Sequence, residues 1–255
     1  MNGFCPLASG SKGNAIYLGS KQTRILIDAG LSAKALFERL AAIDIDPRTI
    51  QAILITHEHT DHIAGLMAVT EALQIPVLAN AETAKGIVSA LQQRPKFKIF
   101  VTGETFHFGD LEVHPFSVPH DTLDPVAFAI RTPEVKVGIC TDLGHATSLV
   151  RKALEVSDYL YLEANHEPSM VHACARPQVY KTRVLGKQGH LSNGDCAKLL
   201  EAVWHEGLKH VHLAHLSSEC NSEEVALTVV RNALKGREVE LSVAYQDRVA
   251  RAVWF

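Results

Sequence analysis

Apolar and polar positions along the chain follow two periodicities, which predict a mixture of strands and helices. Short runs of branched apolar residues bounded by turn-forming residues are typical of buried strands. They occur at residues 24–28, 52–56, 76–79, 99–102, 105–108, 111–116, 126–131, 136–141, 159–163, 211–214 and 239–244. Elsewhere apolar residues recur at helical spacing. We therefore expect helices at residues 32–42, 63–73, 82–91, 148–154 and 223–234, and another after Asn193-Gly194.

The distribution of these segments indicates the fold class. Strands and helices are mixed in both halves, and Gly109-Asp110 separates two strand-like runs as a hairpin turn does. Two sheets covered by helices would bury all of these apolar faces. We find no repeat, linker or low-complexity segment, so we expect an α/β (α+β) fold in a single domain comprising residues 1–255.

The composition narrows the cellular setting and the partners. The chain has 255 residues, of which 47% are hydrophobic and 21% are charged, as in ordinary globular proteins. The formal net charge of −3 gives no support to nucleic-acid binding through overall positive charge, although it allows a local basic patch. The five cysteines are scattered without a Cys-x-x-Cys pair, and no signal peptide or membrane-spanning run is visible. We expect a cytoplasmic protein with free thiols and no membrane partner.

The densest chemical signal is the segment His57-Glu58-His59-Thr60-Asp61-His62, in a chain that has 14 histidines. It directly follows the strand expected at residues 52–56, so a rigid element would hold these side chains while leaving them accessible. Ligand-type side chains at this density cannot all pack into an apolar core. Imidazole and carboxylate groups suit zinc, and also manganese or iron. A metal site accounts for the segment better than a polar loop that is rich in histidine by chance.

Further ligand-type residues follow apolar runs elsewhere in the chain, where strand ends are expected. They are Asp28, His120, Asp142 and His215. Each alone could have an ordinary role, since Asp142 could cap a turn before Gly144 and His120 could be a solvated loop residue. Together with the histidine cluster they form a consistent set. One short segment cannot supply the ligands of two metal ions, so additional ligands of this kind are expected.

The order of these residues resembles the five motifs of the metallo-β-lactamase superfamily, over residues 8–215. The resemblance implies an αββα sandwich with metal ions at the shared edge of its two sheets. It implies two divalent metal sites, one held by His57, His59 and His120 and the other by Asp61, His62 and His215. Asp142 would bridge the two ions, and Asp28 would orient a ligand or stiffen the loop. Such a two-metal site suits phosphoesters, with a hydroxide between the metals as the nucleophile.

Two further segments resemble the tRNA 3′-processing nucleases of this superfamily. Glu163-Ala164 ends an expected strand, as the Glu-Ala of their His-Glu-Ala-Thr motif does, and residues 189–192 are similar to their Gly-His-Ser-Thr segment. The resemblance implies that Glu163 orients His190, and that His190 protonates the leaving oxygen or stabilises phosphoryl charge. The alternative is that Glu163 is a solvated carboxylate at a strand end and His190 a turn residue.

Nearly the whole chain resembles the YycJ/WalJ-type bacterial proteins of the superfamily. The segments that carry this resemblance are residues 7–15, 56–62, 120–121, 124–126, 162–166, 190–193, 215–217 and Asn221. The resemblance implies a metal-dependent nuclease with 5′→3′ DNA exonuclease activity and a role in mismatch repair. His166, within one of these segments, would contact substrate or metal.

Basic residues shortly before His190 are candidates for substrate binding. Arg176, Lys181, Arg183 and Lys187 would follow a phosphate backbone, and Tyr180 would stack on a base. A solvated loop accounts for the same charges equally well. In the same way, the loop at residues 10–14 would donate backbone N–H groups to phosphate or be only a turn between strands.

These observations predict a two-metal phosphodiesterase, specifically a nuclease for which DNA is favoured over RNA as the partner. The same metal core would serve a hydrolase of small molecules, such as a thioester, a lactone or a cyclic phosphodiester. A metal-sensing module is disfavoured, because a structural zinc site is closed whereas this set leaves the bridging position open. The choice among zinc, manganese and iron is open, and so is the oligomeric state.

Overall fold

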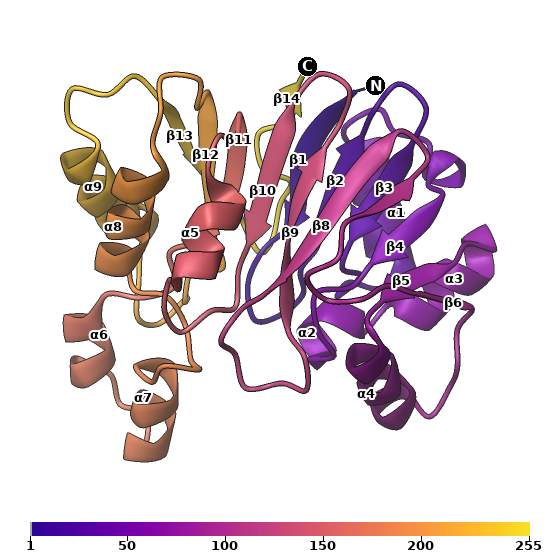
Figure 1. Ribbon diagram of the computed structural model, residues 1–255. Helices are drawn as coiled ribbons and strands as arrows, with labels where there is room; N and C mark the ends of the chain where they lie inside the picture. Colours follow the sequence, from indigo (N-terminus) through magenta and orange to yellow (C-terminus); the bar gives the residue numbers. More distant parts are fainter. Residues whose placement is uncertain (1) are drawn as a thin grey trace.

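The computed structural model describes residues 2–255 and consists of two mixed, seven-stranded sheets packed face to face between helices (Figure 1). The first sheet has the strand order β14-β1-β2-β3-β4-β5-β6. Its strands are β1 (Gly3–Ala8), β2 (Ala15–Gly19), β3 (Arg24–Ile27), β4 (Ala52–Leu54), β5 (Val77–Ala79), β6 (Phe97–Ile99) and β14 (Val253–Trp254). β3 to β6 are parallel, whereas β14, β1, β2 and β3 pair antiparallel.

The second sheet has the order β13-β12-β11-β10-β9-β8-β7. Its strands are β7 (Phe106–Phe108), β8 (Leu111–Ser117), β9 (Val126–Arg131), β10 (Lys136–Cys140), β11 (Tyr159–Glu163), β12 (His210–Ala214) and β13 (Glu240–Val243). β10 to β13 are parallel, and β7 to β10 are antiparallel. The hairpin predicted at Gly109-Asp110 is confirmed, since Phe108 pairs with Leu111 and Gly109 has a φ of 60°.

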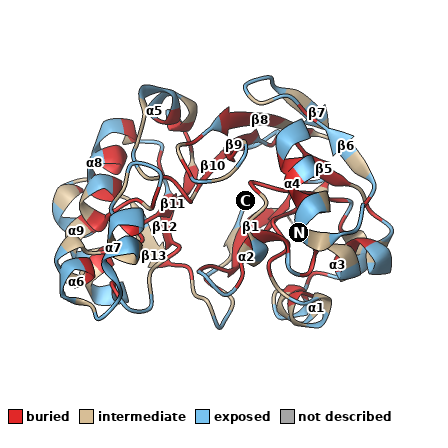
Figure 2. Ribbon diagram, turned by 90° about the horizontal axis from the view of Figure 1, so that it is seen from below, coloured by how far each residue is buried: buried red, intermediate tan, exposed pale blue. Residues whose placement is uncertain are grey.

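Helices cover the outer faces of the two sheets, and their outer sides are exposed (Figure 2). Those beside the first sheet are α1 (Ala33–Ala41), η1 (Pro47–Thr49), α2 (Thr60–Ile63), α3 (Leu66–Leu73) and α4 (Ala81–Leu91). Those that follow β10 in the chain are α5 (Ser148–Leu154), α6 (Pro168–Ala173), α7 (Gln178–Val184), α8 (Asn193–Val203) and α9 (Glu223–Ala233). Within residues 2–255, none of the helices has both the length and the apolar character needed to cross a membrane.

Three apolar layers hold this arrangement together. Phe128 and Tyr161 belong to a cluster buried between the two sheets. Leu36 belongs to a second cluster, under the helices of the first sheet, and Leu199 to a third, under the helices of the second sheet. The longer helices therefore bury one apolar face against a sheet, whereas α6 and α7 pack on each other around Val171 and Val184. The predicted αββα sandwich is confirmed.

Several elements differ from those expected from the sequence. β1 and β2 were not predicted, because all their residues are buried and show no alternation, and Pro6 interrupts β1. The helix expected at residues 63–73 is divided into α2 and α3 around Gly65, where a Cβ atom would lie 1.7 Å from the carbonyl oxygen of Leu31. The strand expected at residues 99–102 lies earlier, as β6. The basic stretch at residues 176–187 contains α7 rather than being a continuous loop.

Candidate metal centre

The ligand-type residues lie at one edge of the sandwich, where strands of both sheets end. Asp28 follows β3, Asp142 lies just beyond β10, and His215 follows β12. These three residues have φ values of 62°, 57° and 54°. Residues other than glycine rarely adopt this left-handed conformation, and it concentrates at functional sites where the surrounding structure holds it in place. The strand ends thus bring residues from distant parts of the sequence into one cluster.

One group of ring nitrogens is formed by His57, His59 and His120. Nδ1 of His59 lies 3.1 Å from Nε2 of His57 and 3.3 Å from Nε2 of His120. The second ring nitrogen of His57 and of His120 is engaged elsewhere. Nδ1 of His120 donates to the carbonyl oxygen of Gly189, and Nδ1 of His57 contacts the hydroxyl of Thr56. The three inward nitrogens are therefore oriented toward a common point.

A second group is formed by Asp61, His62 and His215. Oδ2 of Asp61 lies 3.5 Å from Nε2 of His62 and 3.8 Å from Nε2 of His215. Nδ1 of His62 donates to Oδ2 of Asp28 at 2.8 Å, and Asp28 also accepts the backbone N–H of Thr56. The contact to Asp28 fixes the ring of His62 so that Nε2 faces Asp61. Asp28 therefore has the geometry expected of a residue that orients a ligand.

Asp142 stands between the two groups. Its Oδ2 lies 3.5 Å from Nε2 of His62, and its Oδ1 lies 3.9 Å from Nε2 of His120. Oδ2 of Asp142 and Nε2 of His215 are buried and have no hydrogen-bond partner. Leaving such atoms unpaired costs free energy that a bound cation would remove. The first group offers three imidazole nitrogens and the second two imidazoles and a carboxylate, within 4.8 Å of one another in each group, so these residues fit divalent metal ions.

The two groups differ in their affinity for protons. Burial, followed by the neighbouring imidazoles, holds the pKa of His57 well below its ordinary value, so this ring is neutral and ready to act as a ligand. Burial also opposes protonation of His62, but the Asp28 and Asp142 carboxylates outweigh it and raise the pKa of His62 to about 10. Desolvation is likewise outweighed at Asp61, where the neighbouring His215 and His62 rings lower the carboxyl pKa.

Metal binding is accordingly expected to release protons. His62 carries a proton at neutral pH in the metal-free protein, and its Nε2 must lose that proton to act as a ligand. Because its pKa is about 10, metal affinity should rise as the pH increases from neutral toward that value. Titration calorimetry of zinc binding in buffers with different ionisation enthalpies measures the protons released. The Asp28→Asn variant should release fewer protons near pH 8, because it lacks a carboxylate that raises the pKa of His62. A binding enthalpy that does not depend on the buffer would contradict the expected proton release.

Glu163, at the end of β11, connects the second group to His190. Its Oε1 accepts hydrogen bonds from Nδ1 of His190 and from Nδ1 of His215, both at 2.9 Å. Its Oε2 accepts the backbone N–H groups of Leu143 and Leu191. The carboxylate is completely buried, so the alternative of a solvated strand-end carboxylate is wrong. Although desolvation alone would raise it, the pKa of Glu163 is lowered by His190 and His215, which keeps the side chain ionised.

The residues around the centre include some that the sequence did not single out. Asn14 donates through Nδ2 to Oδ2 of Asp61 at 3.0 Å, while its Oδ1 accepts the backbone N–H of Gly10. In the same loop, the N–H of Lys12 donates to Gln246. These loop donors are therefore engaged within the protein, and the loop positions Asp61. In the sequence this loop stood out as a Gly-rich turn within the segment at residues 7–15, and neither feature reveals the distant partner of Asn14.

His166 is buried beside the site without joining it. It forms an isolated bridge with Ser192, and its Nδ1 is buried without a hydrogen-bond partner. Among the described residues, none of the candidate groups of metal ligands includes it. Desolvation lowers its pKa, so the ring is neutral.

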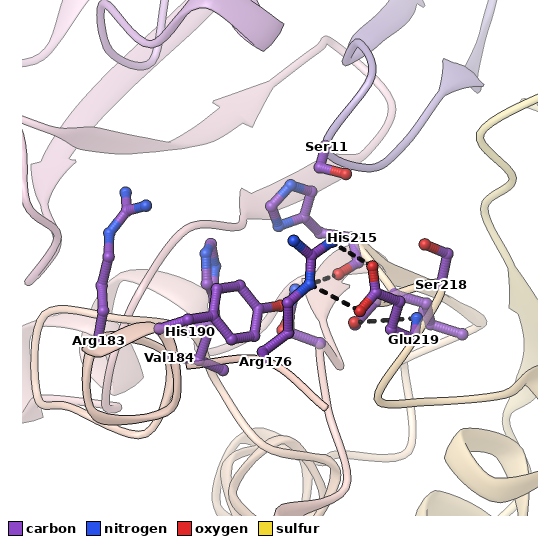
Figure 3. Close-up of a pocket in the computed structure, with 12 residues that line it drawn as sticks. Ser11, Arg176, Arg183, Val184, His190, His215, Ser218 and Glu219 are labelled. Carbon is purple, nitrogen blue, oxygen red and sulfur yellow. Dashed lines mark hydrogen bonds and ion pairs between the residues drawn. The ribbon is translucent and has the colours of Figure 1, made fainter. Parts of the chain in front are cut away.

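The four basic residues considered for substrate binding occupy different surroundings. Arg183 forms a two-point ion pair with Asp121, whose Oδ1 lies 3.5 Å from Nε2 of His120. Arg176 pairs with Glu219, and Lys181 donates to the carbonyl oxygen of His172. Lys187 borders a hollow that it shares with Arg183 and Asp121. Arg176 and Arg183 line one pocket with His190 and His215 (Figure 3), whereas Lys181 and Lys187 do not.

Comparison with known proteins agrees with this geometry. Residues 23–213 match the family described as the beta-lactamase superfamily domain. Exodeoxyribonuclease YycJ of Bacillus anthracis is 33% identical over 246 residues, which cover 95% of this chain and 93% of the relative. Exodeoxyribonuclease WalJ of Streptococcus pneumoniae is 33% identical over 248 residues, which cover 94% of this chain and 91% of the relative.

The fold recurs in solved structures of low sequence identity. The metallo-beta-lactamase fold protein YhfI of Bacillus subtilis aligns with a TM-score of 0.72 at 15% identity, covering 98% of this chain and 99% of that protein. The family match, the two relatives and the cluster of histidine and aspartate side chains that could hold metal ions lead to one conclusion. This chain belongs to the beta-lactamase superfamily, together with the YycJ and WalJ proteins, and is a metal-dependent hydrolase.

Proposed function

We propose that the protein is a two-metal phosphodiesterase that acts as a DNA exonuclease. The observation that carries the proposal is the position of Glu163, which hydrogen-bonds both a candidate metal ligand, His215, and the half-buried His190 at the same carboxylate oxygen. A hydrolase that only activates water needs the metals alone, whereas cleavage of a phosphodiester also benefits from a proton donor for the leaving oxygen. The two relatives named exodeoxyribonucleases support DNA as the substrate.

In this proposal the chain holds two divalent ions, zinc or manganese, with iron as the third candidate. His57, His59 and His120 would hold one ion, Asp61, His62 and His215 would hold the other, and Asp142, whose carboxylate lies between the two groups, would serve both sites. When bound, such ions make water nucleophilic near neutral pH and neutralise charge on the phosphate. Asp28 and Glu163 orient His62 and His215 by accepting a hydrogen bond from Nδ1 of each ring, which leaves Nε2 available as a ligand atom.

His190 is the proposed proton donor to the leaving oxygen. Nδ1 donates to Glu163, which leaves Nε2 as the nitrogen available to substrate, and the side chain is 18% exposed. The Glu163 carboxylate holds the ring in this orientation. Glu163 itself is a positioning residue, because its complete burial keeps it from contacting substrate.

The His190→Ala variant is expected to lower kcat by about 100-fold or more, the contribution typical of a positioned general acid, with a smaller change in KM. Steady-state kinetics on a single-stranded DNA substrate measures both parameters. The exposed His107, on β7, provides the matched control, since His107→Ala should leave both unchanged. An effect confined to KM would move His190 from proton transfer to substrate binding.

The proposed function is tested by restoring Mn²⁺ or Zn²⁺ to metal-stripped protein and following cleavage of end-labelled single-stranded DNA, duplex DNA and RNA. Metal-dependent shortening of DNA from one end is expected, and the product ladder gives the polarity. Protein that is shown to hold two metals but cleaves none of these substrates would overturn the nuclease proposal. Thioesters, lactones and cyclic phosphodiesters would then be the substrates to test.

A further inference from the structure

A polar pocket of about 290 Å³ adjoins the metal centre on the side of His190 and His215. α7 supplies Tyr180 and Arg183 to its wall, and the segment after β12 supplies Ser217 and Glu219. In Figure 3, Arg183 lies at one side of the pocket and the Arg176–Glu219 pair at the other, with His190 and His215 between them. The pocket is thus continuous with the place where chemistry is proposed and is bounded on its far side by an ion pair.

We infer that this pocket is a subsite for one nucleotide at the end of a single DNA strand, the nucleotide that leaves when the phosphodiester is cleaved. The inference rests on the proposed function and adds to it the strandedness of the substrate and the size of the product. It assigns base recognition to Tyr180 and Arg176, and phosphate recognition to Arg183.

The base-recognition side is built from planar groups. Tyr180 is half-buried on α7, where it packs against the small apolar cluster of Val171, Val184 and Cys220. The guanidinium of Arg176 lies 5.4 Å from the centre of the Tyr180 ring, and Glu219 holds that guanidinium in place. Aromatic rings and guanidinium planes are the surfaces on which unpaired nucleobases stack in proteins that bind single strands. A base held there would be stacked without being read for its identity.

The phosphate-recognition side is Arg183. Its guanidinium binds Asp121 through two hydrogen bonds, yet the side chain is 56% exposed. Exposed ion pairs contribute little stability, so a phosphate group can replace Asp121 as the partner at small cost. The planar guanidinium suits a phosphate as well as it suits a carboxylate. Asp121 would therefore hold Arg183 at the mouth of the metal centre until substrate arrives.

The size of the pocket limits what it accepts. Small-molecule sites span about 300–1,000 Å³, and the volume of about 290 Å³ lies just below that range. This volume matches a single nucleotide better than a base pair, so we expect the end of a duplex to be unpaired before it enters. The Arg176–Glu219 pair lines the far side of the pocket.

The neighbours of the pocket also determine which fragment it holds. Because His190 lines it, the nucleotide inside carries the oxygen that receives the proton of His190. The oxygen of a water molecule bonds to phosphorus and the water gives up one proton to solvent. The bond from phosphorus to the leaving oxygen breaks, the leaving oxygen takes up the proton of His190, and His190 regains a proton from solvent. The released fragment is then a single nucleotide, and the shortened strand remains outside the pocket.

The decisive experiment compares single-stranded substrates whose terminal nucleotide has or lacks its base. In the native protein, removal of the base at the end that is attacked should raise KM by about ten-fold, within the range that one base stack contributes. Tyr180→Ala should raise KM for the intact strand by a similar factor and should make the enzyme nearly indifferent to the missing base. Tyr180→Phe should restore the preference, and Val179→Ala, which alters the exposed neighbour on α7, should behave as the native protein does.

The outcomes separate the inference from the proposed function. Equal KM values for intact and base-free ends in the native protein would overturn the subsite, and this result needs no substitution that could disturb folding. Products no shorter than dinucleotides would also overturn it. If the native protein cleaves no DNA, the nuclease proposal fails, and the pocket is tested by titrating deoxyadenosine monophosphate into the metal-free protein. Binding that Tyr180→Ala weakens about ten-fold would support the subsite, and absence of binding would reject it.

Discussion

Replacement of Asp61 with alanine is expected to lower kcat by at least about 100-fold, since even residues that only orient a metal ligand contribute 10–100-fold. Asp61 is proposed to hold the second metal ion directly, together with His62 and His215. In the native protein its carboxylate lies 3.5 Å from Nε2 of His62 and 3.8 Å from Nε2 of His215. The variant keeps these two imidazoles but loses the negatively charged member of the group. One bound metal ion in place of two is the expected result, and metal analysis measures it beside the kinetics.

The fold should survive this substitution. The Asp61 side chain is 23% exposed, and the backbone carbonyl that accepts the N–H of Asn14 is retained in the variant. Circular dichroism and a denaturant titration would check folding. Glu82→Ala, which removes an exposed carboxylate from α4, is the control that should retain full activity. Undiminished turnover by a folded Asp61→Ala variant would refute the two-metal proposal.

The second large effect is expected from Glu163→Gln, a substitution that changes the size of the side chain very little. All four partners of the Glu163 carboxylate are donors: Nδ1 of His190 and His215, and the N–H groups of Leu143 and Leu191. A glutamine amide has one acceptor oxygen and one donor nitrogen. In either orientation, the NH₂ group of the amide therefore faces two hydrogen-bond donors and cannot accept a hydrogen bond from them.

The two orientations have different consequences. With the NH₂ group toward the leucines, two buried backbone N–H groups lose their acceptor, which costs about 1–3 kcal/mol for each unsatisfied group. With the NH₂ group toward the histidines, Nδ1 of His215 must become an acceptor. Its proton then moves to Nε2, the nitrogen that is proposed to hold the metal ion. The variant must lose stability or metal affinity, and each loss is measurable separately.

We therefore expect Glu163→Gln to lower the free energy of unfolding, the metal content or both, together with a fall in kcat of about 10–100-fold or more. Urea unfolding of the metal-free protein and metal titration distinguish the two routes. The exposed Glu201 on α8 supplies the control, because Glu201→Gln makes the same chemical change at a position outside the site. Native stability, metal content and kcat in the Glu163→Gln variant would show that the shared carboxylate does not orient the two histidines.

Much of the fold followed from local patterns. Strands such as β3, β4 and β10 are continuous apolar runs, and the β7–β8 hairpin is marked by a glycine that can adopt a positive φ. β1 and β2 have no polar alternation, because both of their faces are covered, so their sequences do not distinguish strand from other buried structure. The short helices α6 and α7 bury only Val171 and Val184 and therefore leave almost no periodic signal.

The sequence by itself determined the types of candidate ligand and their places at strand ends. Imidazole and carboxylate groups in close succession after an apolar run cannot all pack into an apolar core, and they are well suited to bind metal ions. It also indicated that Glu163 and His190 act as a pair. Only the tertiary structure decided that Glu163 serves His215 as well, that Asn14 positions Asp61, and that Asp121 and Glu219 hold Arg183 and Arg176. The physical reason is that these partners come from segments far apart along the chain, and only the packing of the two sheets brings their hydrogen-bonding atoms together.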